Sequence, residues 1–221
     1  MNFNTHVIQR YYPLLLEALW VTTWICGISL AIGIVLGLFA CIGKLSRKGI
    51  GYYISSSFID FFRTIPEVVI IFWAYFCLPL LFNIKMSGLV CGVIALSVFA
   101  GAFLAEIFRA GVLAVPKGQV EAAYALGIPN YFVWRHAILP PAIHRMMPAF
   151  VNFLTELIKA SSLLSAIGIG ELFYRASILG GETYRYMELL SAVAVLYFLL
   201  IFPLSMIARI TELRRVQRTG H

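Results

Sequence analysis

The segment ALWVTTWICGISLAIGIVLGLFACIG, residues 18–43, contains no Asp, Glu, Lys or Arg, and it decides the fold class. A helix needs roughly 20 mainly apolar residues to cross the core of a bilayer. Three more charge-free segments follow, at 68–84, 86–105 and 189–208. They do not alternate apolar and polar residues as the strands of a membrane barrel do. Because helices satisfy their own backbone hydrogen bonds in lipid, these segments predict an all-α membrane protein.

The composition supports this prediction. The 221 residues are 61% hydrophobic and 12% charged, which is about half the charged fraction of a soluble domain. A fifth apolar segment, at 146–170, is interrupted by Glu156 and Lys159. We therefore expect residues 1–221 to form one transmembrane domain, a bundle of about five helices. The expected spans are approximately 16–43, 66–84, 86–113, 146–170 and 187–209.

The net charge of +7 would suggest nucleic-acid binding in a soluble protein, but here the basic residues gather between apolar segments. Most of the 17 Lys and Arg follow the first, third and fifth spans: Lys44, Arg47, Lys48, Arg63; Arg109, Lys117, Arg135, Arg145; Arg209, Arg214, Arg215, Arg218. By the positive-inside rule, this bias places the N-terminus in the periplasm and the C-terminus in the cytoplasm. Lipid is therefore an expected partner and nucleic acid is not.

The sequence shows no pattern typical of a metal site or an enzyme. Four cysteines stand singly in or beside apolar segments, without CxxC or a nearby His, so they predict apolar packing: Cys26, Cys41, Cys77, Cys91. The four histidines are scattered, and no nucleophile is paired with a base, which makes an intramembrane enzyme the last of the function classes. The first apolar run is too long for a cleaved signal peptide, so it is interpreted as a span.

The loop at 116–146 is far longer than the roughly 2–8 residues usual between helices. Its first part, KGQVEAAYALG at 117–127, favours a short helix that Gly127 and Pro129 end. Small residues on this helix would allow a partner to approach closely, and Glu121 offers it a carboxylate. The spacing alone fits two interpretations equally: a helix that docks on a partner, or a helix folded back onto its own chain.

Family resemblance adds to this pattern. EAA at 121–123, Gly127 and Ile138-Leu139-Pro140 resemble the EAA loop of ABC-importer permeases, with Ala137 where Ile is usual. Three further segments are similar to the polar-amino-acid branch of that family, the histidine, glutamine, glutamate and arginine type: FRTIPEVVIIFWAYFCLP (62–79), AEIFRAGVLAVPKGQVEAAYALG (105–127) and LIKASSLLSAIGIGEL (157–172). Glu67 departs from the branch, which more often has an apolar residue there. The likeness covers most of the chain.

The resemblance implies a type I importer fold and a set of partners. The chain would be a permease without a cofactor, and two copies of a separate ATPase would bind ATP and magnesium. A second permease chain, identical or related, and a periplasmic solute-binding protein would complete an amino-acid importer. Glu121, Ala122, Ala123 and Gly127 would form the cytoplasmic coupling helix that docks on the ATPase. In line with this, the sequence has no GxxxxGK[ST] phosphate loop. The alternative is a self-sufficient secondary transporter or channel for a small polar solute, a class in which inverted repeats are common.

A polar stripe interrupts the fourth span. Asn152, Glu156 and Lys159 have the spacing i, i+4, i+7 and so share one helical face. Ionisable groups in a membrane cost about 2.5–3.5 kcal/mol each, so they face a cavity or pair with each other. One hypothesis is that the stripe lines the substrate path, with Glu156 attracting an amino or guanidinium group. The other is a structural ion pair between Glu156 and Lys159.

Two further sets of charged residues lead to predictions from their positions. Glu106 and Arg109, at i,i+3, predict an ion pair at the membrane edge. After the small residues at 161–170, a charged outer segment predicts either a solvated loop or a contact with the solute-binding protein: Glu171, Arg175, Glu182, Arg185.

Overall fold

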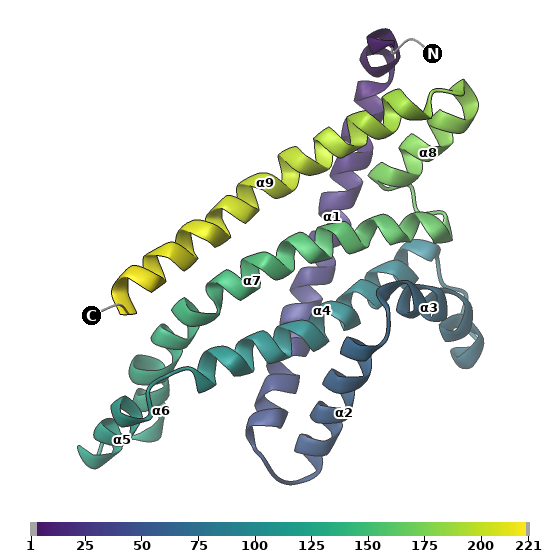
Figure 1. The fold of residues 1–221 in the computed structure, drawn as a ribbon. Coiled ribbons are helices and arrows are strands. Elements are labelled where there is room, and N and C mark those ends of the chain that lie inside the picture. The colour runs from purple at the N-terminus through teal and green to yellow at the C-terminus, as the bar shows by residue number, and fades with distance from the viewer. Residues whose placement is uncertain (1–3, 220–221) are drawn as a thin grey trace.

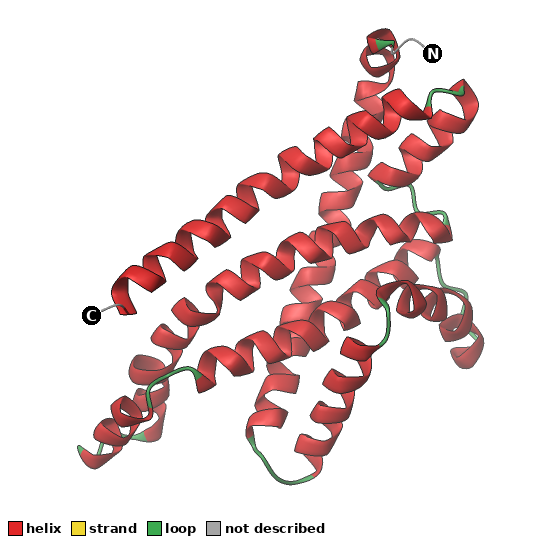
Figure 2. Cartoon of the chain, viewed as in Figure 1, coloured by secondary structure: helices red, strands yellow, loops and turns green. Residues whose placement is uncertain are grey.

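The computed structural model describes residues 4–219, with side chains as far as Ile210, and every regular element in these residues is a helix (Figure 2). The all-α prediction is therefore confirmed. Arg214, Arg215 and Arg218, part of the predicted basic flank, lie outside the residues with described side chains.

The elements follow one another as α1 (Thr5–Leu45), α2 (Ile50–Thr64), α3 (Glu67–Phe82), α4 (Gly88–Leu113), α5 (Lys117–Ala125), α6 (Asn130–Phe132), the π-helical segment η1 (Val133–Ile138), α7 (Leu139–Ser161), the 3-10 segment η2 (Ser162–Ile167), α8 (Leu172–Thr183) and α9 (Tyr186–Thr219). In Figure 1, α4, α7 and α9 run side by side, and α1 passes behind them. The end of the bundle that carries α5 is called the α5 end below, and the opposite end the α8 end.

Four helical stretches in the described residues are long and apolar enough to cross a membrane: Thr5–Leu45, Gly88–Leu113, Asn130–Ile167 and Tyr186–Ile210. A fifth span exists only if α2 and α3 count as one broken span, bent by 107°. The break follows from Pro66, because a proline forces the preceding residue, Ile65, out of the helical region, and Ile65 is extended here. The predicted span 66–84 thus corresponds to α3, half of this bent pair.

Several helices extend beyond the predicted spans. α1 begins at Thr5 rather than near 16, and the Asn4 side chain caps it by accepting from the His6 amide. α7 begins at Leu139 rather than near 146, because Pro140 and Pro141 lie in its first turn. Backbone N–H groups in the first turn have no acceptor within the helix, so proline is tolerated there. Apolar windows in the sequence therefore mark the centres of these helices and not their ends.

The main core joins α1 to α4 at very short range. A Cβ placed on Gly33 would lie 2.6 Å from the Cβ of Ala100, and one on Gly101 would lie 2.8 Å from the Cβ of Leu36. Such close approach, through small residues, is how helices associate in lipid. Aromatic rings of α4 then meet α7, where the Phe103 and Phe153 rings stack 5.7 Å apart.

A second core lies at the α8 end and joins the beginning of α1 to α8 and the beginning of α9. It contains Leu15 and Ala18 of α1, Leu172 and Ala176 of α8, and Leu189 of α9. Polar bonds reinforce it, since the Thr22 hydroxyl accepts from the Leu172 amide at 3.1 Å. These bonds fix α8 against α1.

Candidate functional site

The α5 helix is partly folded back onto its own chain and partly free. Ala123 is buried in a small core with Val115, Val133, Ile138 and Ala142. Glu121 and Ala122 are exposed. Each of the two interpretations of the sequence therefore describes one side of α5: Ala123 holds the helix in place, and the face with Glu121 and Ala122 stays open.

Gly127 ends α5 by a specific backbone turn. Its φ is +71°, in the left-handed region that glycine adopts without strain. The Gly127 amide donates to the Tyr124 carbonyl at 2.9 Å, and the Ile128 amide donates to the Ala123 carbonyl at 3.2 Å. This pair of bonds is the Schellman motif, which satisfies the last carbonyls of a helix. The spacing from EAA at 121–123 to Gly127 is thus set by the end of α5 and its cap.

The π-helical segment η1 joins the α5 region to α7. In an α-helix, the carbonyls of His136 and Ala137 would pair with the amides of residues 140 and 141, but both of these are prolines without an N–H. The backbone instead takes the wider register, in which the Leu139 amide donates to the Trp134 carbonyl. As a result, one helical stretch, Asn130–Ile167, runs from the α5 region through the polar stripe.

The polar stripe lies on one face of α7. Asn152, Glu156 and Lys159 are all exposed, whereas Phe153 and Leu157 between them are buried. The Lys159 Nζ lies 2.9 Å from the Glu156 Oε1, and the two side chains are 56% and 61% exposed. Among the residues whose side chains are described, neither Glu156 nor Lys159 forms an ion pair with another helix of this chain. The pair is therefore exposed on the outside of the single chain.

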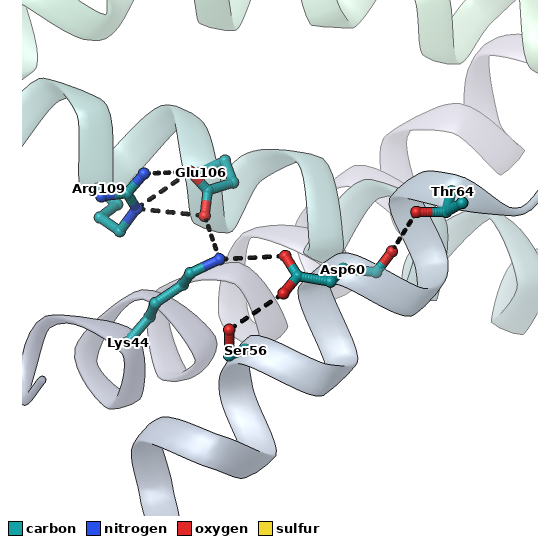
Figure 3. A network of polar contacts seen from close by, with 6 residues as sticks. All are labelled: Lys44, Ser56, Asp60, Thr64, Glu106 and Arg109. Atoms are coloured by element: carbon teal, nitrogen blue, oxygen red, sulfur yellow. Dashed lines mark hydrogen bonds and ion pairs between the residues drawn. The ribbon is translucent and has the colours of Figure 1, made fainter. Parts of the chain in front are cut away.

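The ion pair predicted between Glu106 and Arg109 is present, and it belongs to a larger network at the α5 end (Figure 3). The Lys44 Nζ of α1 lies 2.8 Å from the Glu106 Oε1 and 3.3 Å from the Asp60 Oδ1 of α2. The Ser56 hydroxyl donates to the other Asp60 oxygen at 3.1 Å. Sequence spacing missed Lys44 and Asp60, because residues on different helices leave no periodic signal.

Glu171 corrects the prediction of a charged outer segment. Its side chain is neither solvated nor available to a partner, since it is fully buried at the start of α8. The carboxylate accepts from the Phe173 and Tyr174 amides at 2.9 and 2.7 Å, and from the Tyr197 hydroxyl at 3.1 Å. Burial raises the pKa of Glu171 to about 7, and these hydrogen bonds act in the opposite direction. Glu171 is an N-cap, a role that its place just before an apolar helical run fits.

The residues that the structure describes do not form a metal site. Among the residues that the structure describes, no three His, Cys, Asp or Glu side chains come together as they would around an ion. The four cysteines are unpaired thiols, and three of them are buried.

Comparison with known sequences places these features in a family. Residues 30–217 match the model of the binding-protein-dependent transport system inner membrane component. The chain is 36% identical to the glutamine transport system permease protein GlnP of Escherichia coli, over 97% of this chain and 98% of that protein. It is 34% identical to the arginine transport system permease protein ArtQ of Bacillus subtilis, over 96% and 97% of the two chains.

Solved structures agree. A crystal structure of an amino acid ABC transporter with histidines superposes with a TM-score of 0.88 at 31% identity, covering 97% of this chain and all of that one. The MetNI methionine ABC transporter, in an inward-facing form, shares the fold with a TM-score of 0.73 at 24% identity. The helical bundle therefore belongs to a known architecture. The chain is a member of the family of inner-membrane components of binding-protein-dependent transport systems, a multi-pass permease of the ABC-importer type.

Proposed function

We propose that this chain is the permease subunit of an importer of polar amino acids, driven by ATP that a separate ATPase binds together with magnesium. The relatives named above are permeases for glutamine and arginine, and this similarity supports the substrate class. The chain itself holds no cofactor and catalyses no reaction. Its N-terminus faces the periplasm and its C-terminus the cytoplasm, so the α5 end is cytoplasmic.

The observation that carries this proposal is the exposed face of α5. Glu121 and Ala122 are open to a partner, while Ala123 and the Gly127 cap hold the helix rigid from behind. A rigid helix projecting from the bundle transmits a push from a partner as a rigid-body movement. Two copies of the ATPase, one on each of two permease chains, would engage this helix, and a solute-binding protein would deliver substrate at the α8 end.

The stripe on α7 supports a substrate path. Glu156 and Lys159 are more than half exposed on the outside of a single chain. If this face met lipid, each charge would cost about 2.5–3.5 kcal/mol. A second permease chain that faces α7 across water removes that cost and creates a path lined by Asn152, Glu156 and Lys159. In that path the Glu156 carboxylate meets the amino or guanidinium group of the substrate.

The docking role is tested by purifying the tagged chain from native membranes in mild detergent. The wild type is expected to bring down a P-loop ATPase, and Glu121→Arg is expected to lose it. Glu182→Arg, which reverses an exposed charge at the α8 end, is the matched control and should retain the ATPase. If the wild type recovers no ATPase in several detergents, the importer assignment fails for this chain.

The role of the stripe is tested by uptake in proteoliposomes. Glu156→Gln should lower amino-acid uptake while ATPase association persists. The double variant Glu156→Gln/Lys159→Gln separates the two hypotheses, because it removes both charges of the pair. Uptake that stays low in the double variant supports a substrate contact. Uptake that recovers shows that Glu156 only neutralises Lys159.

A further inference from the structure

The end of α4 is the point where α5 attaches to the bundle. α4 ends at Leu113, and Ala114, Val115 and Pro116 lead directly into α5. Glu106 and Arg109 lie in the last turns of α4. A displacement of α5 therefore reaches the end of α4 through this short connection, and reaches η1 and α7 through the small core around Ala123.

One joint at the end of α4 is apolar and leads to α7. A Cβ placed on Gly111 would lie 2.9 Å from the Cβ of Met146 and 3.0 Å from the Ala142 carbonyl oxygen. Ala142 also belongs to the small core that holds α5. α7 is thus attached to α5 and to the end of α4 by close packing, and its movement needs no charged group.

The other joint is charged and leads to α1 and α2. Lys44 and Glu106 are only 16% and 15% exposed, so water screens their 2.8 Å contact little. Arg109 donates to both carboxylate oxygens of Glu106. Directly beneath, Ala40 of α1, Ile59 of α2 and Ala105 of α4 form a small core of their own. Glu106 is the carboxylate at which the cations of α1 and α4 meet.

We propose that Glu106 is a positioning residue that makes the α5 ends of α1 and α2 follow the end of α4, so that a push on α5 moves them as one body. This inference rests on the proposed coupling role of α5. Glu106 contacts no substrate. Without its charge, Lys44 keeps only the 66% exposed Asp60 as a partner, and Arg109 loses its bidentate carboxylate. Two partly buried cations would then repel across the interface they now join.

The first test measures substrate imported per ATP hydrolysed, with the whole complex in proteoliposomes. Because this is a ratio, it does not change merely because less complex folds. Glu106→Gln should retain the ATPase partner and lower the ratio by about twofold to thirtyfold, the range of coupling changes that mutations between linked sites produce. Glu17→Gln, which changes an exposed carboxylate of α1 near the α8 end and remote from α5, is the matched control and should keep the wild-type ratio.

The second test replaces the charged joint by a covalent one. A Cβ on Gly37 of α1 would lie 3.0 Å from the Cβ of Leu104 of α4, two residues from Glu106. This is close to the roughly 3.5–4.5 Å between the Cβ atoms of a disulfide. The pair Gly37→Cys/Leu104→Cys is introduced after the four native cysteines are replaced. Oxidation should leave the ratio unchanged when Glu106 is present, and should restore it in Glu106→Gln. Reduction should reverse the rescue.

The outcomes separate this inference from the proposed function. An unchanged ratio in an assembled Glu106→Gln complex overturns the positioning role. So does a cross-link that stops transport in the chain with Glu106, because α1 and α4 would then have to move apart. If Glu106→Gln does not assemble, the cross-link in the chain with Glu106 decides alone. Failure of the wild type to bind an ATPase refutes the proposed function instead, whatever the cross-link does.

Discussion

Replacement of Gly127 tests why the EAA loop has a glycine at this position. The glycine either allows the left-handed backbone turn that ends α5, or allows the ATPase to approach closely. Its φ of +71° costs an L-residue such as Ala about 1–2 kcal/mol. Space is not the obstacle, because a Cβ on Gly127 would meet nothing within 4 Å. Gly127→Ala should therefore weaken the two bonds that cap α5 without any clash. Asn tolerates the left-handed region much better, so Gly127→Asn should retain the cap.

The assay is amide hydrogen exchange of the purified chain in nanodiscs, followed by titration with the ATPase partner. In Gly127→Ala, the backbone amides of residues 127 and 128 should exchange roughly 5–30-fold faster than in the wild type. This factor corresponds to the cost of about 1–2 kcal/mol for the left-handed φ. The Kd for the ATPase should rise by at most the same factor. Gly127→Asn should lie near the wild type in both measurements.

The order of the two variants decides the question. Asn is larger than Ala, so a glycine that is needed for close approach by the ATPase would make Gly127→Asn the weaker binder. A Kd that is higher for Asn than for Ala would refute the argument from the backbone turn. Equal Kd values with faster exchange only in Ala would show that the cap is formed but plays no part in docking.

Three further predictions concern helix packing, a buried hydrogen bond and a buried carboxyl group. Gly33→Val should lower stability by about 1–3 kcal/mol through overpacking, whereas Gly27→Val, with open space around it, should not; thermal unfolding in detergent compares the two. Thr22→Val removes a buried acceptor and should cost about 1–3 kcal/mol, but Thr23→Val, which loses only bonds within its own helix, should cost less. Because its pKa is raised, Glu171 keeps its proton to a higher pH in the folded chain than in the unfolded chain. The free energy of unfolding should therefore fall by up to about 3 kcal/mol as pH rises from about 4.5 to about 7. A Glu171→Gln variant whose unfolding temperature kept the wild-type pH dependence would contradict this cause.

The sequence predicted the features that depend on neighbours along one helix. The helical class, the Glu106–Arg109 pair and the shared face of Asn152, Glu156 and Lys159 all follow from spacing, and the structure has each of them. The roles of the stripe and of the EAA residues stay predictions, since no contact with a substrate or an ATPase is present to test them.

Features that depend on contacts between distant segments could not be predicted from the sequence. Lys44 and Asp60 complete the network from two other helices, and no period in the sequence links them to Glu106. The charges of Arg175 and Glu182 predict that Glu171 lies in a solvated loop or contacts the solute-binding protein, whereas the packing of α1 and α9 over the start of α8 buries it. The bend between α2 and α3 was visible only as Pro66, and its 107° angle depends on how both helices pack.

The core at the α8 end has a consequence for how the protein is made. It joins the beginning of α1 to α8 and α9, and a bond from the Asn4 amide to Glu188 spans 184 positions of sequence. During synthesis, α1 enters the membrane while its partners have not yet been translated. The apolar side of its first turns must therefore wait for α9, and a nascent chain stopped before α9 leaves that side uncovered. Arrival of α9 in the membrane, rather than insertion of each earlier helix in turn, is then the event that closes this core, and chains stopped before it present quality-control proteases with an unfinished surface.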